Sequence, residues 1–290
     1  MTITTTGPSR YSFSNAAPEG DEQLRLLAGI LDEHSTAVLG RIGVTAGWHC
    51  LDIGPGAGTI THWIAERVGP DGHVTSLDLD PRHIPTAGNI TVRQGDVRTA
   101  QLPADHYDLI HARLLLLHLT DRDAVIRRLV AALKPGGLLV TSDWDTTRRD
   151  VLLHAPNEAC AAAFDAFQDA LLGILEHNGA DLGWARRAPL SLRAAGLVDL
   201  QTEVNNRLWP GGTAANLLHV SNSYQLRDPL LARGVTNEQL ELVRTAMLDP
   251  QALAYCYPTY TSIGRRPLPD APDPAFEDAG GGPARGRRAE

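Results

Sequence analysis

Hydrophobic positions between residues 45 and 145 switch repeatedly between short apolar runs and helical spacing. The short runs predict strands, at residues 49–54, 73–80, 90–96, 107–112 and 134–145. Helical spacing follows at residues 60–69 and 121–133, and Pro81 stands where a proline starts a short helix without losing a hydrogen bond. Repeated strand–helix units of this length require a parallel sheet with helices on both faces.

The pattern changes on either side of this segment. Residues 21–43 show helical spacing, which predicts one or two helices, with an interruption at residues 34–36, where a hydroxyl side chain caps the second. Further helices are predicted at residues 155–178, 213–226 and 236–248. Residues 197–209 and 253–266 are predicted as strands that pair in an antiparallel hairpin at the sheet edge, with the helices between them forming a lid.

Together these elements predict an α/β fold with a doubly wound, mostly parallel, seven-stranded sheet, an antiparallel edge hairpin and a helical lid. We expect an N-terminal helical cap, a core, a lid that also supplies the final strands, and a tail, at residues 1–44, 45–150, 151–266 and 267–290. The tail is rich in proline, glycine and charge, and its low apolar content predicts disorder.

Composition narrows the function classes. The net charge of −8 disfavours a nucleic-acid partner, because such partners favour basic surfaces. No apolar run reaches the length of about 18 residues that a membrane span needs, and the polar N-terminus does not resemble a signal peptide. The three cysteines are far apart and match no metal or disulfide pattern, which predicts free thiols. We therefore expect a cytoplasmic protein without a metal, a monomer or homodimer whose partner is a small molecule.

The motif "DIGPGAG" places Gly54, Gly56 and Gly58 between the first strand and the first helix of the core. Glycines at such a turn let the backbone approach a ligand closely at the carboxyl edge of the sheet. The dinucleotide fingerprint needs its third glycine one residue later, so a nicotinamide-dependent oxidoreductase is disfavoured. Asp52, just before the glycines, suits an ammonium group better than a pyrophosphate, which favours an amino-acid-bearing nucleoside.

Further acidic residues stand at the ends of the next two strands. Asp78 is placed to bind both ribose hydroxyls, and Asp96 to accept a hydrogen bond from an adenine amino group, with Val97 beside the ring. Asp80 is predicted to cap the helix that Pro81 starts, or to act as a second acid at that edge. Aspartate is common in turns, so the argument rests on several acids at successive strand ends on one edge.

In this order the motifs "CLDIGPGAG", "LDLD", "QGDV", "YDLIHARLLLLHL" and "LKPGGLLV" resemble those of class I S-adenosylmethionine-dependent methyltransferases. The resemblance covers residues 45–145 and is strongest to the small-molecule branch that includes ubiquinone/menaquinone-biosynthesis and natural-product methyltransferases. It implies a Rossmann-like methyltransferase fold, S-adenosyl-L-methionine as cofactor and S-adenosyl-L-homocysteine as product.

The resemblance also implies roles for individual residues. The three glycines pass under the methionine part of the cofactor, and Asp52 orients its ammonium end through water. Asp78, with Leu79 beside it, holds the ribose, while Asp96 and Val97 hold the adenine. The segment His111, Ala112 and Arg113 passes the sulfonium end. The implied cofactor-binding residues are Asp52, Gly54, Gly56, Gly58, Asp78, Leu79, Asp96, Val97, Ala112 and Arg113.

The expected reaction is an in-line methyl transfer to a small-molecule acceptor, such as a secondary metabolite, in which alignment of the acceptor is the main task of the enzyme. Two alternatives stay open: a non-methylating reaction with the same cofactor, such as a cyclisation, and a non-catalytic binding protein. His111 is the main candidate for a catalytic base, and His118, His154 and His219 are weaker candidates. Candidate acceptor-binding residues are Tyr11, Phe13, Trp144, His154, His219 and Tyr224.

Overall fold

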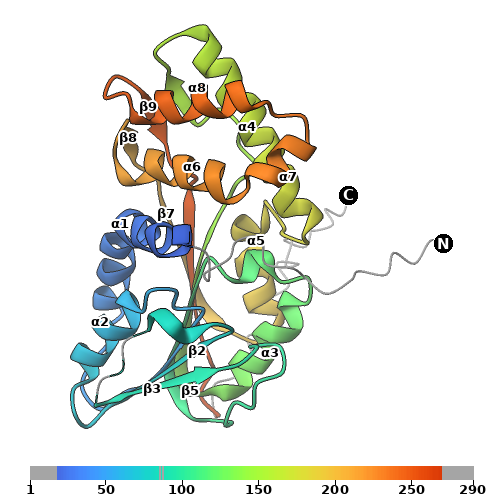
Figure 1. The fold of residues 1–290 in the computed structure, drawn as a ribbon. Coiled ribbons are helices and arrows are strands. Elements are labelled where there is room, and N and C mark those ends of the chain that lie inside the picture. Colours follow the sequence, from blue (N-terminus) through green and yellow to red (C-terminus); the bar gives the residue numbers. More distant parts are fainter. Residues whose placement is uncertain (1–17, 85, 87, 270–290) are drawn as a thin grey trace, which may run out of the picture.

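The computed structural model describes residues 18–84, 86 and 88–269. Within these residues, the main sheet has seven strands in the order β3-β2-β1-β4-β5-β10-β7 (Figure 1). The strands are β1 (His49–Ile53), β2 (His73–Asp78), β3 (Ile90–Gln94), β4 (Tyr107–Arg113), β5 (Leu133–Trp144), β7 (Val198–Asn205) and β10 (Thr259–Arg265). The first five pair in parallel, and β10 runs antiparallel to both of its neighbours, β5 and β7. The predicted fold class is confirmed.

Each face of the parallel part is covered by its own helices, and side chains alternate between the two faces along each strand. On β1, Leu51 and Ile53 pack with α3 (Arg122–Ala132) and α5 (Trp184–Ala194). Cys50 faces the other way, toward α2 (Thr59–Val68) and the end of α1 (Pro18–Arg41). Two hydrophobic clusters therefore sandwich the sheet, as expected for a doubly wound fold.

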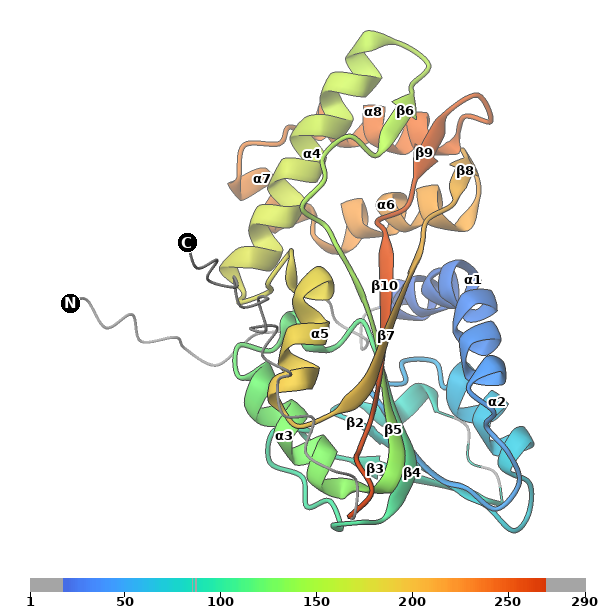
Figure 2. The same cartoon turned by 180° about the vertical axis from the view of Figure 1, so that it is seen from behind.

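The antiparallel edge pairing is confirmed, since Thr259–Arg265 pairs with both β5 and β7. Each predicted edge strand is, however, split in two. β7 continues after a break as β8 (Leu208–Pro210), and β9 (Leu253–Tyr255) precedes β10. In the described part of the chain, β8 and β9 join β6 (Leu152–His154) in a separate three-stranded sheet, which Figure 2 shows above the main one.

The lid stands above the carboxyl edge of the main sheet (Figure 1). Its helices are α4 (Glu158–His177), α6 (Ala214–Gln225), α7 (Arg227–Ala232) and α8 (Asn237–Leu248). Phe164 and Phe167 are fully buried at its centre, in a cluster to which α1 also contributes. The helices predicted at residues 155–178, 213–226 and 236–248 are confirmed, whereas α5 and α7 were not predicted.

The N-terminal helix α1 is continuous, so the predicted interruption at residues 34–36 is wrong. Thr36 Oγ1 donates to the carbonyl of Asp32 at 2.8 Å, which satisfies the hydroxyl inside the helix instead of capping a new one. His34 reaches across to Thr261 Oγ1 at 2.9 Å and ties the helix to β10. The continuous helix spans from α2 up to α6 and so joins core and lid.

Among the described residues, no helix has the length and apolar character that a membrane crossing requires. Cys50, Cys160 and Cys256 are free and buried. In the same part of the chain, no cluster of three or more histidine, cysteine or acidic side chains is arranged to hold a metal ion.

Candidate functional site

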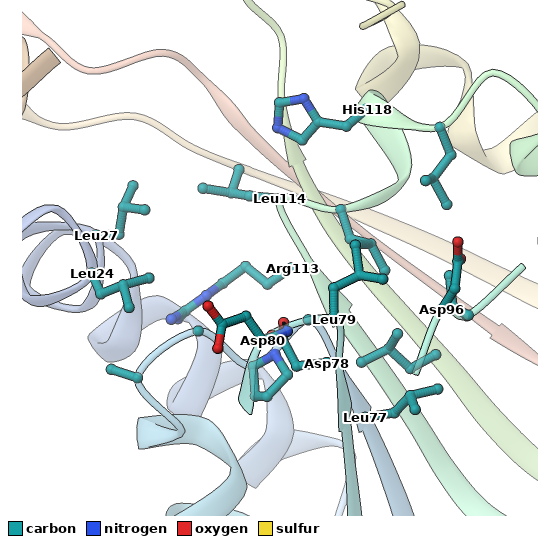
Figure 3. A pocket seen from close by; sticks show the side chains of 18 of the residues that line it. Leu24, Leu27, Leu77, Asp78, Leu79, Asp80, Asp96, Arg113, Leu114 and His118 are labelled. Atoms are coloured by element: carbon teal, nitrogen blue, oxygen red, sulfur yellow. Dashed lines mark hydrogen bonds between the residues drawn. The ribbon is translucent and has the colours of Figure 1, made fainter. Parts of the chain in front are cut away.

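A cavity of about 380 Å³ opens at the carboxyl ends of β1, β2, β3 and β4. Its floor is the loop from Ile53 to Thr59, one side comes from the ends of β2 and β3, and the other side comes from α1 and the segment after β4. Figure 3 shows Asp78 and Asp80 near the centre, Asp96 on one side, and Leu24 and Leu27 on the other. In parallel α/β sheets, ligands bind at this edge.

The glycine loop is built from left-handed backbone. Gly54, Gly56 and Gly58 have φ values of 62°, 59° and 75°, which side chains rarely adopt. A Cβ on Gly54 would lie 3.2 Å from Leu115 Cδ1, and one on Gly56 would lie 3.0 Å from Leu24 Cδ2. Both the backbone conformation and these close neighbours therefore favour glycine at positions 54 and 56. Gly54 and Gly56 line the cavity, whereas Gly58 stands at the start of α2.

Asp78 and Asp80 both line the cavity but differ in their surroundings. Asp78 Oδ1 accepts a hydrogen bond from the backbone N–H of Asp80 at 2.9 Å, and burial raises the pKa of Asp78. Asp80 forms an ion pair with Arg82 at 2.8 Å. Its side chain does not cap the helical turn at Pro81–His83, so the predicted cap is wrong. Leu79, between them, also lines the cavity and is exposed.

Asp96 and Val97 lie two and three residues beyond β3, and both line the cavity. Val97 is buried and packs with the core cluster beneath the sheet edge. Asp96 is paired with Arg98, whose Nη2 lies 2.6 Å from Asp96 Oδ2. The hydrogen bonds from Arg98 lower the pKa of Asp96, so this carboxylate is ionised at neutral pH. Arg98 was not predicted from the sequence, although its position in "QGDVR", two residues after Asp96, places it close enough to pair with that carboxylate.

The side of the cavity toward the lid is mostly leucine. α1 supplies Leu24 and Leu27, and the segment after β4 supplies Leu114 and Leu119. His118 lies on the same side, next to Leu114 (Figure 3), and burial lowers its pKa to about 4. In the sequence, the apolar run "RLLLLHL" that follows a predicted strand corresponds to this side of the cavity.

Arg113 crosses from the end of β4 to α1 along this side (Figure 3). Its Nη1 donates to Asp32 Oδ1 at 2.8 Å and to Ser35 Oγ at 3.1 Å. The ion pair fixes α1 against the sheet edge, and Arg113 also lines the cavity. Its neighbour Ala112 points into the core and is not part of the lining.

Asp52 and His111 are not in the cavity, contrary to expectation. Side-chain alternation turns both toward the α2 face of the sheet, on the same side as Cys50. There, His111 Nδ1 lies 2.8 Å from Asp52 Oδ1, and Thr61 Oγ1 donates to Asp52 Oδ2 at 2.7 Å. Both carboxylate oxygens are thus engaged behind the loop, and both residues are buried. The network supports the glycine loop from below.

A buried carboxylate supports the segment after β4. Asp143, at the end of β5, accepts a hydrogen bond from Trp184 Nε1 at 3.0 Å and a long one of 3.5 Å from the backbone N–H of Leu117. Burial raises the pKa of Asp143 to about 7. Asp143 therefore links α5 to the short helical turn Leu116–His118, which carries part of the cavity wall.

The candidate acceptor residues fall into three groups. Trp144, at the end of β5, and His219, on α6, are buried in the hydrophobic cluster under the lid. The Trp144 ring is tilted against Tyr257, and His219 packs edge-on against Phe164, Phe167 and Tyr257. Leu27 and Leu114 pack against the same cluster and also line the cavity. His154 and Tyr224 are exposed on the lid surface. Tyr11 and Phe13 lie outside the described residues.

The geometry defines the class of ligand first. Left-handed glycines open the floor, Asp78 follows one strand and Asp96 follows the next, so an extended ligand with hydroxyl and amino groups fits across the strand ends. The apolar end toward α1 leaves room for a second, less polar group. The lining of the cavity is therefore of a kind that suits a nucleoside.

Comparison with known proteins narrows this class. Residues 51–139 match the family model of a methyltransferase domain. The chain is 27% identical over 143 residues to the ubiquinone/menaquinone biosynthesis C-methyltransferase UbiE of Pseudomonas paraeruginosa, covering 46% of this chain and 53% of that protein. It is 25% identical over 176 residues to the enzyme of the same name from Shewanella woodyi, covering 50% of this chain and 69% of that protein. The chain thus spans about half the length of the Pseudomonas relative.

Solved structures share the fold. Phosphoethanolamine N-methyltransferase 2 of Haemonchus contortus, in complex with S-adenosyl-L-methionine, superimposes with a TM-score of 0.54 at 16% identity, covering 88% of this chain and 58% of that chain. The YcgJ protein of Bacillus subtilis gives 0.53 at 15% identity, covering 81% and 99%. Residues 51–139 thus match a methyltransferase domain, and the chain is similar to S-adenosylmethionine-dependent methyltransferases. The resemblance inferred from the motifs is confirmed.

Proposed function

We propose that this protein transfers a methyl group from S-adenosylmethionine to a small-molecule acceptor. The observation that carries the proposal is the cavity itself. It joins a glycine floor, Asp78 and Asp96 at one end to an apolar wall under the lid at the other. One end suits a nucleoside and the other suits a separate, less polar molecule.

The residues at the nucleoside end fit the cofactor. Gly54 and Gly56 line the cavity without a side chain, which allows the methionine part to lie against the backbone. Asp78 is placed to accept hydrogen bonds from the ribose hydroxyls, because its carboxylate lies in the cavity at the end of β2. Asp96 is placed to accept one from the adenine amino group, and Val97 packs beside the ring.

Bound S-adenosylmethionine supplies a methyl group made electrophilic by the positive sulfur. The protein then has to align the acceptor with this methyl group, and holding two reactants in place lowers the activation free energy by several kcal/mol. Arg113 and its bonds to Asp32 and Ser35 hold α1 at a fixed distance from β4, which sets the width of the cavity. Leu27, Leu114 and Leu119 exclude water from the acceptor end.

The acceptor end has limited acid–base capacity. Burial lowers the pKa of His118 to about 4, so its ring is neutral at pH 7 and accepts or donates a hydrogen bond without charge. His111 is paired with Asp52 behind the glycine loop, and we do not assign it the role of base. Trp144 and His219 belong to the hydrophobic cluster against which Leu27 and Leu114 pack, and we propose that this cluster shapes the acceptor wall.

The similar proteins support a small-molecule acceptor, since their names refer to ubiquinone/menaquinone biosynthesis and to phosphoethanolamine. The test is incubation of the purified chain with methyl-labelled S-adenosylmethionine and a panel of acceptors that carry hydroxyl, amino or activated carbon nucleophiles. We expect label in an acceptor together with S-adenosyl-L-homocysteine in equal amount. Cofactor binding without any transfer, across a panel that includes extracts of the source cells, would contradict methyl transfer.

A further inference from the structure

Asp96 and Arg98 form a closely fitted ion pair in the cavity wall. Arg98 Nη2 lies 2.6 Å from Asp96 Oδ2, while Arg98 Nε lies 2.9 Å from Oδ2 and 3.0 Å from Oδ1. The backbone N–H of Arg98 donates to Oδ1 as well, at 2.9 Å. A carboxylate offers about four lone-pair sites. A single neighbouring residue therefore occupies most of the acceptor capacity of Asp96.

The pair is shielded and faces the ligand space. The side chains of Arg98 and Asp96 retain 26% and 24% of their exposure, and both residues line the cavity. Partial burial strengthens the attraction between the charges relative to water. Any further donor that approaches Asp96 from the cavity thus meets a carboxylate that is already engaged.

The loop that carries the pair is held in place without it. Arg128 on α3 donates to the carbonyl of Val97 at 2.8 Å and also to the carbonyls of Arg98 and Ala100. The backbone N–H groups of Thr99 and Ala100 donate to the carbonyl of Asp96 at 3.0 and 2.7 Å. The guanidinium of Arg98 can consequently leave Asp96, or be removed by substitution, while the loop keeps its main-chain anchors.

We propose that Arg98 competes with the 6-amino group of the cofactor's adenine for Asp96 and thereby sets the base specificity of the site. The inference rests on the proposed function, which places adenine at Asp96. An amino group must share or displace the bonds from Arg98, so Arg98 lowers the affinity for an aminated base. The guanidinium carries hydrogen-bond donors only, so it can donate a hydrogen bond to a base that has an oxo group at position 6. Arg98 thus reduces the preference of the site for a base with a 6-amino group over a base with a 6-oxo group.

The test is calorimetric titration of the full chain with 5′-methylthioadenosine and 5′-methylthioinosine, which differ at position 6 of the base. In Arg98→Gln we expect the adenosine compound to bind about fivefold more tightly and the inosine compound to bind less tightly, because freed charged acceptors form stronger hydrogen bonds. Arg98→Lys keeps the charge but lacks the planar fork, and it should fall between wild type and Arg98→Gln.

The chain contains a matched control. Arg82 pairs with Asp80, also two residues earlier and also at a strand end, but Arg82 does not line the cavity. Arg82→Gln should leave the affinities for both compounds within about twofold of wild type, because the effect of removing an exposed ion pair is small.

The outcomes separate the two proposals. Arg98→Gln with a wild-type unfolding temperature and an unchanged ratio of the two affinities overturns the role of Arg98, and so does weaker binding of 5′-methylthioadenosine. If Arg98→Gln does not fold, Arg98→Lys decides by the same ratio. Absence of binding of both S-adenosylmethionine and 5′-methylthioadenosine to the wild type would instead overturn the proposed function.

Discussion

The cofactor end of the core and the lid stabilise their structures by different means. At the cofactor end, position follows from backbone geometry: three left-handed glycines and the ends of consecutive parallel strands place each group. In the lid, position follows from side-chain packing, with Phe164, Phe167 and His219 in mutual contact across α4 and α6. Backbone conformation therefore sets the positions of groups in the first region, and side-chain packing sets them in the second.

The largest effect should come from the centre of the lid. Phe167→Ala removes a fully buried ring, and such truncations lower the free energy of unfolding by about 3–5 kcal/mol. We expect the affinity for S-adenosylmethionine to stay within about threefold, because the cavity floor belongs to other clusters. Denaturant unfolding and calorimetry measure both quantities.

A core variant provides the contrast. Leu116 belongs to the segment after β4 and is fully buried, so Leu116→Ala should lower both stability and cofactor affinity. A tenfold loss of cofactor affinity in Phe167→Ala would show that the lid and the cofactor end are one energetic unit.

The glycine loop should respond in the opposite way. Gly54→Val combines a φ of 62°, which β-branched residues avoid, with a Cβ 3.2 Å from Leu115, so we expect binding of S-adenosylmethionine to weaken by about a hundredfold. Gly234→Ala in the lid is the control, since its φ is 93° with no atom within 4 Å of the added Cβ. That variant should lose stability alone. Equal affinities for the two variants would argue against the loop as the binding floor.

The lid also contains a group whose titration affects stability. Burial lowers the pKa of His219 to about 4, whereas an unfolded histidine titrates near 6.5. Between these values the unfolded chain binds a proton that the folded chain does not, so stability is present above pH 6.5 and is lost as the pH falls toward 4.

Replacing His219 should remove this dependence. Relative to His219→Phe, the wild type should lose about 1–2 kcal/mol of unfolding free energy between pH 8 and pH 5. His118 titrates in the same window, so the difference between the two proteins isolates His219. Parallel stability curves for the two proteins would show that the buried ring does not titrate as described.

The smallest effect is expected at the lid surface. Tyr224 is exposed, and Arg244 lies 3.7 Å from its ring centre, a contact that stabilises by about 0.5–1 kcal/mol. Tyr224→Ala should lower stability by that amount and leave the rate of methyl transfer unchanged. A tenfold loss of transfer with normal stability would place Tyr224 at the acceptor.

The same contrast explains what the sequence predicts. Strand ends, glycines and acids are local signals, so the parallel sheet and the cavity residues Gly54, Asp78 and Asp96 follow from the sequence. The role of Asp52 was predicted wrongly because the prediction used only its place just before the glycines. Its hydrogen-bond partners, Thr61 and His111, come from other elements of the fold. Cys50 and Asp52 are two residues apart on one strand, so they share a face of the sheet. Because Cys50 is a core residue, this alternation predicts that Asp52 also points into the core.

The lid is predicted less fully for a physical reason. α5 contains Pro189, which breaks the usual helix signal, and packing of Trp184 against the core overrides that preference. The strands β8 and β9 are three residues each and exist because they pair with one another and with β6. Such pairings depend on residues about 50 to 100 positions apart and leave little trace in local pattern.

Calorimetric binding of S-adenosylmethionine to Asp78→Ala and Asp80→Ala tests the central claim most directly. Both carboxylates line the cavity two residues apart, but Asp80 is already paired with Arg82. The structure predicts a loss of about tenfold or more in Asp78→Ala and less than about threefold in Asp80→Ala, because a lost hydrogen bond to a charged group costs about 1.5–3 kcal/mol. Unchanged affinity in Asp78→Ala would contradict the assignment of the site.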